Sequence, residues 1–170
     1  MNLVLSNGGD EVSSWVYSDW DALYENLNNR PVSTPAKILL SGSNYCGTDG
    51  PYDLSGVTFE GGGRNVGGVL ILQDGTTWSA GPTAFKDMTL TIPTLAAAVL
   101  STQVGTWRCT FEACKINVSG AGGTPAGFTV GGAGSRYLNF IDTEIDNSAT
   151  YPLLSKSPNL NLSFRASAKC

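Results

Sequence analysis

The residues best suited to chemistry are three carboxylates in the segment FIDTEIDN, namely Asp142, Glu144 and Asp146. Alternate residues of a strand face the same side, so Glu144 and Asp146 are expected to project together from an outer face. Such a pair could bind a sugar or Ca²⁺, or provide acid and base for glycoside hydrolysis. Asp142 is expected at a corner, where Asp commonly accepts backbone N–H groups. The alternative, which we favour, is a solvated strand face with a corner aspartate. The three carboxylates are therefore fallback catalytic candidates only.

Other kinds of catalytic and metal site find little support. The chain contains no histidine, which excludes a Ser-His-Asp or Cys-His arrangement. Cys46, Cys109, Cys114 and Cys170 form no Cys-x-x-Cys pair, so no metal site is predicted. Cys109 and Cys114 fall on expected inward positions, and we expect all four cysteines to be free thiols. The segment 61–68, GGGRNVGG, lacks the Lys-Ser/Thr of a phosphate loop and is predicted to be a turn or loop. No cofactor is predicted.

Composition favours one all-β domain. The 170 residues include 21 glycines, and only 14 % of them are charged. The net charge is −4 and no run of Lys or Arg occurs, so nucleic acid is not an expected partner. The N-terminal sequence MNLVLSNGGDEVSS has no basic region and only a short apolar stretch, which predicts no signal peptide. No segment is long enough to span a membrane, and we expect synthesis in a host cytoplasm.

A repeated pattern predicts the architecture. An apolar residue, a spacer, a small or turn-prone residue, any residue, a spacer and an apolar residue recur five times, the last copy degraded. The copies begin at Leu54, Phe85, Phe111, Phe140 and Phe164, and their third positions are 31, 26, 29 and 24 residues apart. Alternation of apolar and polar residues around a one-residue corner predicts strands in a short right-handed parallel β-helix, a solenoid. Adjacent repeats should place Lys115 and Asn117 beside Glu144 and Asp146.

One helix is predicted, over residues 18–30. Ser18 and Asp21 have the spacing of a capping box, and the apolar residues Trp20, Leu23, Tyr24 and Leu27 share one face. We expect this helix to cap the open N-terminal end of the solenoid, although a partner-binding helix is the alternative reading. The predicted organisation is an N-terminal arm, 1–17, followed by a single β-helix domain, 18–170.

Several segments have looser predictions. The run 69–72, VLIL, suggests a strand buried on both faces or covered by a partner. Residues 96–100 could form a helical turn or a strand, and the glycine-rich segment 120–134 is expected to be a long excursion. Aromatic residues outside the inward pattern are candidates for a protein interface. The main candidates are Trp15, Tyr17, Trp78, Tyr137 and Tyr151, and Tyr45 and Tyr52 also lie outside the inward pattern. Trp78 is expected in a turn.

The opening of the chain resembles a known family. The residues that carry the likeness are the helix with Trp15, Asp19, Trp20, Leu23 and Leu27, the Ile38-Leu39-Leu40 strand, and the motif Leu54-Ser-Gly-Val-Thr-Phe59-Glu-Gly. Together they resemble pectate-lyase-like β-helix proteins, and more narrowly the phage and viral members: tailspikes, fibre shafts and related virion components. The resemblance implies a homotrimer. It supplies no catalytic residue, and this chain is shorter than enzymatic tailspikes.

Three functions follow as expectations. The first is a bacteriophage or viral virion structural protein that decorates or reinforces a capsid, or forms part of a tail or fibre. The second is a host-glycan or receptor-binding module of a tailspike. The third, a polysaccharide lyase or glycoside hydrolase, depends only on fold analogy and on the three carboxylates. We therefore expect a non-enzymatic protein, located in the virion, whose partners are copies of itself and other virion proteins.

Overall fold

The computed structural model describes residues 2–6, 16–31, 34–64, 67–73, 76–92, 97–100, 106–119, 127–130, 134–147, 154–155 and 160–166. Within these ranges the chain forms eighteen strands and one helix, α1 (Trp20–Asn28). Every strand pairing among them is parallel. The all-β class with parallel sheets is thus confirmed.

The strands form three sheets, and the largest has the order β18-β15-β12-β9-β6-β3-β1-β2. Its members are β1 (Asn2–Ser6), β2 (Val16–Tyr17), β3 (Ala36–Ser41), β6 (Val57–Glu60), β9 (Ala84–Lys86), β12 (Trp107–Glu112), β15 (Arg136–Ile141) and β18 (Leu160–Arg165). The second sheet contains β4 (Ser43–Tyr45), β7 (Val69–Ile71), β10 (Thr89–Ile92), β13 (Lys115–Val118) and β16 (Glu144–Asn147). The third contains β5 (Tyr52–Asp53), β8 (Thr77–Ala80), β11 (Ala97–Leu100), β14 (Gly127–Val130) and β17 (Leu154–Ser155).

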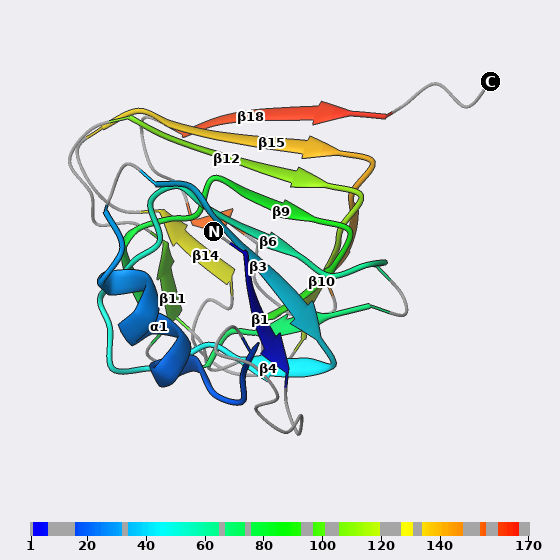
Figure 1. The fold of residues 1–170 in the computed structure, drawn as a ribbon. Coiled ribbons are helices and arrows are strands. Elements are labelled where there is room, and N and C mark those ends of the chain that lie inside the picture. Colours follow the sequence, from blue (N-terminus) through cyan, green and yellow to red (C-terminus); the bar gives the residue numbers. More distant parts are fainter. Residues whose placement is uncertain are drawn as a thin grey trace.

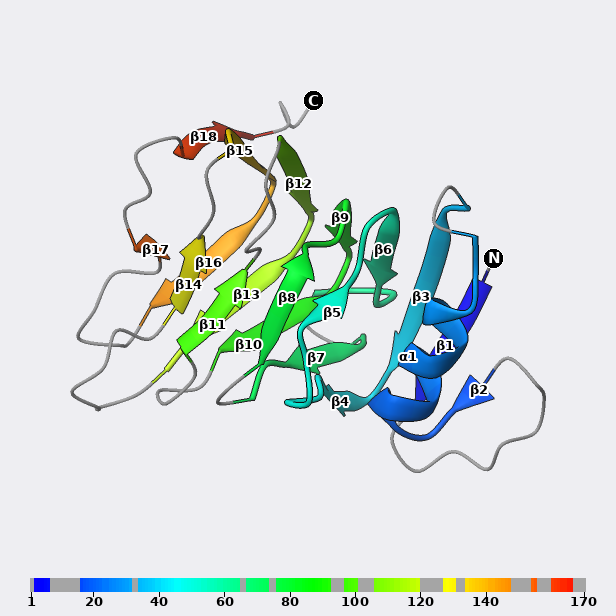
Figure 2. The same cartoon turned by 90° about the vertical axis from the view of Figure 1, so that its left-hand side faces the viewer.

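From β3 onward the chain visits the three sheets in a constant order. It passes from the first sheet to the second, then to the third, and then returns to the first. From β6 onward, each strand therefore pairs with the strand that comes three places earlier in the chain. Figures 1 and 2 show the resulting stacks, with β1 and α1 toward one end and β18 at the other.

A column of stacked phenylalanine rings runs through the core. Phe59, Phe85, Phe111, Phe140 and Phe164 lie on successive strands of the first sheet, with neighbouring ring centroids 4.9–5.5 Å apart. Their ring planes differ by no more than 12°. The first four rings are buried. In-register parallel pairing places each ring over the previous one, so the same residue type recurs at this position.

The first copy of the predicted repeat has the wrong register. Phe59, rather than Leu54, is the partner of Phe85 across the β6–β9 pair. The spacing from Phe59 to Phe85 is therefore 26 residues, equal to that from Phe85 to Phe111. Leu54 and Gly56 belong instead to the connection between β5 and β6. Both corners carry an apolar-small-apolar pattern, and the sequence pattern could not distinguish them.

The predicted one-residue corners between the first and second sheets are confirmed. Asp87, Ala113 and Asp142 have φ angles of 47°, 51° and 49°, in the left-handed region. Gly42, between β3 and β4, has φ of 68° and marks the same corner one strand earlier. A non-glycine residue is strained in this conformation, and Asp tolerates it better than most.

The predicted helix is present, but it begins one residue later than its expected cap. Asp19, not Ser18, is the N-cap, and its carboxylate accepts the Ala22 N–H at 2.9 Å. Trp20 is buried and stacks on Phe59 at 6.2 Å between ring centroids. The helix therefore covers the N-terminal end of the phenylalanine column. The expected arm also contributes to the first sheet, because β1 pairs with β3 and buries Leu3 and Leu5.

Four looser predictions can be compared with the structure. Trp78 lies in strand β8 and is completely buried, so its predicted position in a turn is wrong. The segment 120–134 contains strand β14, so it is not merely an excursion. Residues Ala97–Leu100 form strand β11, which decides between the helix and strand alternatives. In 69–72, Leu70 and Leu72 are buried while Val69 and Ile71 are half-buried.

A pair of alanine-to-glycine substitutions tests the strain at the corners. Ala113→Gly removes the Cβ that opposes a φ of 51°, and we expect a gain in unfolding free energy of about 0.5 kcal/mol. Ala22→Gly, in α1, should instead lose about 0.5–1 kcal/mol. Urea denaturation of the two variants measures both changes. Equal destabilisation by both substitutions would contradict the corner assignment.

Three thiols are free and buried, at Cys46, Cys109 and Cys114. Burial raises the pKa of Cys114 to about 11 and raises the pKa values of Cys46 and Cys109 as well. The Cys114 thiol also donates to the Glu112 carbonyl at 3.3 Å. The inward placement predicted for Cys109 and Cys114 is confirmed, whereas Cys170 lies outside the described residues.

These raised pKa values predict a loss of stability at high pH. Below pH 9 a thiol is protonated in both the folded and the unfolded state, and its contribution is constant. Between pH 9 and about 11 Cys114 ionises only in the unfolded chain, which lowers the unfolding free energy by about 1.4 kcal/mol per pH unit.

Guanidinium denaturation under reducing conditions at pH 8, 9 and 10 measures this slope. Cys114→Ala should have a shallower slope than the wild type, because lysines and tyrosines titrate equally in both proteins. Identical slopes would show that Cys114 is not buried as a neutral thiol.

Candidate functional site

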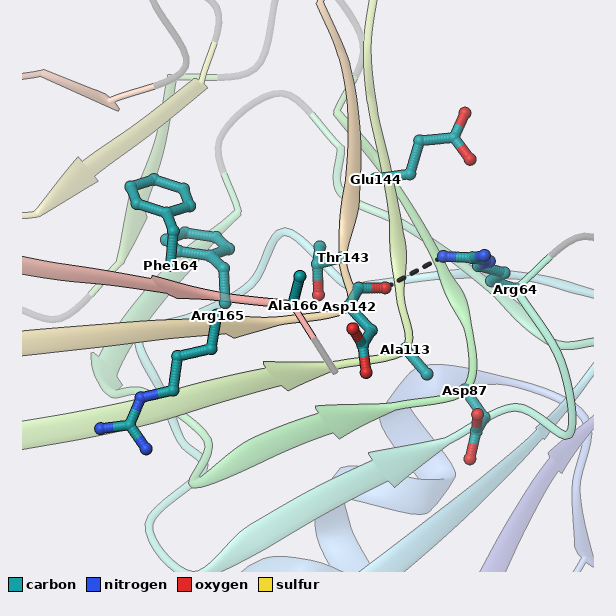
Figure 3. Close-up of a pocket in the computed structure, with 10 residues that line it drawn as sticks. Arg64, Asp87, Ala113, Asp142, Thr143, Glu144, Phe164, Arg165 and Ala166 are labelled. Carbon is teal, nitrogen blue, oxygen red and sulfur yellow. Dashed lines mark hydrogen bonds between the residues drawn. The ribbon is translucent and has the colours of Figure 1, made fainter. Parts of the chain in front are cut away.

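An open hollow of about 740 Å³ lies where the first and second sheets meet, near the β18 end of the molecule. Its lining combines corner residues, exposed charged groups and two rings of the phenylalanine column, as Figure 3 shows for most of them. The lining residues are Arg64, Asp87, Ala113, Phe140, Asp142, Thr143, Glu144, Phe164, Arg165 and Ala166. Two of the three predicted carboxylates, Asp142 and Glu144, are among them.

Two hydrogen bonds to the backbone of Asp142 hold this residue at its corner. Its N–H donates to the Arg165 carbonyl at 3.0 Å, and its own carbonyl accepts from the Arg64 guanidinium at 2.9 Å. The second contact joins residues 78 positions apart and is the dashed line in Figure 3. The predicted corner position of Asp142 is therefore correct.

Glu144 and Asp146 lie as the sequence predicted. In the pairing of β13 with β16, Lys115 is opposite Glu144 and Asn117 is opposite Asp146. The Lys115 ammonium is 3.2 Å from the Glu144 carboxylate, and the Glu144 side chain is half exposed. Asp146 is exposed and does not line the hollow. This geometry matches a solvated strand face with a cross-strand ion pair.

Two features of the hollow were not found from the sequence. Arg64 lies in the loop between β6 and β7, and nothing in that loop's sequence indicates a contact with Asp142. Phe164 was recognised only as the start of a degraded repeat. It is 64 % exposed although it stacks on Phe140, so one face of its ring is open.

The interface candidates divide into three groups. Tyr17 and Tyr137 are half-buried, and Arg108 lies over the Tyr137 ring at 4.6 Å. Trp78 is in the core and cannot contact a partner. Trp15 and Tyr151 lie outside the described residues. Of the other two aromatic residues that the sequence places outside the inward pattern, Tyr45 is 53 % exposed and Tyr52 is buried.

Comparison with known proteins identifies no relative. No family model, curated protein or solved structure matches this chain. Among the described residues, no helix is long and apolar enough to cross a membrane. In the same residues, no group of three or more Cys, Asp or Glu side chains could hold a metal ion.

A double-mutant cycle tests the nature of the Glu144 carboxylate. Lys115→Ala and Glu144→Ala, alone and combined, should give a coupling energy of about 0.2–1 kcal/mol that decreases in 1 M salt. The Lys86–Glu112 pair, 2.8 Å apart, is the control, because its glutamate is exposed to a similar degree and its lysine is more exposed. A coupling of several kcal/mol at Lys115–Glu144 alone would contradict a solvated strand face.

Proposed function

We propose that this protein is a bacteriophage or viral virion structural protein, built as a trimeric right-handed parallel β-helix with an N-terminal capping helix. In this role it decorates or reinforces a capsid, or forms part of a tail or fibre. The observation that carries the proposal is the continuous stack of in-register strands and rings, from Leu3 and Ile38 through Phe59 to Phe164.

The order of the strands supports the β-helix. A chain that visits three parallel sheets in constant order, and pairs each strand with the one three places earlier, advances by one strand in every sheet per circuit. Each circuit then buries its apolar face only against its neighbours, as in a solenoid. The parallel connections within one sheet favour the right-handed form.

The outer face of the strands supports a structural role. Ion pairs join Lys37 to Glu60 and Lys86 to Glu112, at 2.7 and 2.8 Å, between adjacent strands of the first sheet. The Lys115–Glu144 pair does the same in the second sheet. The charges of this surface are thus largely engaged in cross-strand pairing. Together with the likeness to phage virion components, this favours assembly over catalysis.

The second sheet provides the surface that best suits a lateral trimer. Tyr45 lies opposite Ile71 in the β4–β7 pair, and Val69 is on the same outer face. Tyr45 is exposed while Val69 and Ile71 are half-buried, so three apolar side chains adjoin on this face. Burial of such a cluster against identical chains accounts for the apolar run at 69–72. Trp78 has no place in this interface.

A second candidate function is host-glycan binding. It is favoured by the hollow, where the open face of Phe164 lies beside Glu144, Arg64 and Arg165. Sugars are commonly held by an aromatic face together with charged hydrogen-bonding groups. We rank this function second because Glu144 and Arg64 already have partners within the chain.

The virion role predicts that the protein is found in purified particles of the virus that encodes it. Mass spectrometry of such particles should detect it in copy numbers divisible by three. In solution, Tyr45→Lys should lower the mass measured by light scattering to one third, because a charge then replaces the apolar contact. Asn28→Lys, at an exposed position of α1 outside this cluster, is the control for added charge.

Two outcomes would overturn this proposal. Oligosaccharide binding that Phe164→Ala abolishes and Tyr45→Lys leaves intact would favour the glycan-binding function. A solution mass that is not a multiple of three chains would reject the trimer.

A further inference from the structure

The two ends of the first sheet differ in their covering. At the N-terminal end, β1 buries Leu3 and Leu5, and Trp20 of α1 covers Phe59. At the other end, β18 is the last strand of the sheet among the described residues. Leu162 and Phe164 on β18 are 45 % and 64 % exposed, although their partners Leu138 and Phe140 are buried. The side chains on the core side of the sheet are therefore exposed to solvent at β18.

The free edge of β18 has a defined hydrogen-bonding pattern. The Arg165 carbonyl accepts the Asp142 N–H, so the backbone groups of Arg165 point toward the rest of the molecule. Backbone groups alternate in direction along a strand, so those of Leu160, Leu162 and Phe164 point outward from the sheet. These are also the residues whose side chains lie on the core side.

We propose that β18 pairs with β18 of a second copy of this chain, antiparallel and in a register centred on Leu162. In this register Leu162 lies opposite Leu162 of the second copy, and Leu160 lies opposite Phe164. All the outward backbone groups of residues 160–164 then form hydrogen-bonded pairs, because only alternate residues of an antiparallel pair exchange both bonds. Each apolar side chain also stays on the core side.

Charge and symmetry both favour a second copy related by a twofold axis. Residues 160–164 carry no charge, so this pairing places no like charges opposite one another. A head-to-tail arrangement would instead bring β18 against the end that β1, β2 and α1 already cover. In an isologous contact both copies use the same surface, so the two β18 edges cover each other and no further copy can add there. The contact forms whether or not the chains also associate laterally.

Charge reversal at the centre of the register tests this proposal. Leu162→Lys and Leu162→Glu each place like charges directly opposite across the twofold axis, and each variant should have half the wild-type mass by light scattering. An equimolar mixture of the two variants should return to the wild-type mass, because Lys then faces Glu. Far-UV circular dichroism verifies that both variants fold, which the 45 % exposure of Leu162 favours.

Ser163→Lys is the matched control, because residue 163 faces Asn161 of the second copy and no like charge is opposite it. This variant should keep the wild-type mass. An unchanged mass for Leu162→Lys would overturn the proposal, and so would halved masses that mixing does not restore. Failure of the lateral trimer is recognised separately, since Tyr45→Lys changes the mass by a factor of three and the Leu162 variants by a factor of two.

Discussion

The structure depends on one constraint, the in-register stacking of inward side chains between parallel strands. A parallel pair places equivalent residues directly over one another, so a ring at one level needs a ring or a similar apolar group at the next. Phe85, Phe111 and Phe140 meet this requirement with nearly parallel rings. The outer charges obey the same rule, since opposite charges adjoin where Lys and Glu follow one another from strand to strand.

The corners follow from this stacking. A strand that must end at the same level as its neighbour has to turn at the same residue, and the left-handed conformation makes that turn within one position. Asp87, Ala113 and Asp142 adopt it despite their Cβ atoms, because the paired strands on both sides fix the backbone. The strained backbone at each corner is therefore the cost of keeping the two sheets aligned.

Alternation of apolar and polar residues over short segments made much of the fold predictable. Prediction was wrong where a feature depends on packing between distant segments. The strand class, the corners at 87, 113 and 142 and the Lys115–Glu144 pairing follow from period-two patterns around a corner. The helix face follows from apolar residues three and four positions apart. The prediction that the first repeat starts at Leu54 was wrong, because two different corners have similar residue types. The predicted position of Trp78 was wrong because its glycine-flanked sequence is typical of a turn. Packing against Phe85 instead decides that Trp78 is buried. The Arg64 contact joins distant segments and leaves no local signal.

The candidate site is best understood by separating residues that the fold explains from those that it does not. The corner geometry accounts for Asp142, and cross-strand pairing accounts for Glu144. Neither carboxylate therefore requires a catalytic explanation. Leu162 and Phe164 differ, because they continue the buried columns of Leu138 and Phe140 and yet remain exposed. When another strand covers these exposed apolar groups, their surface is removed from water and the free energy of the assembly decreases. For this reason we expect the β18 edge, rather than the carboxylates, to make a contact with a second copy of the chain.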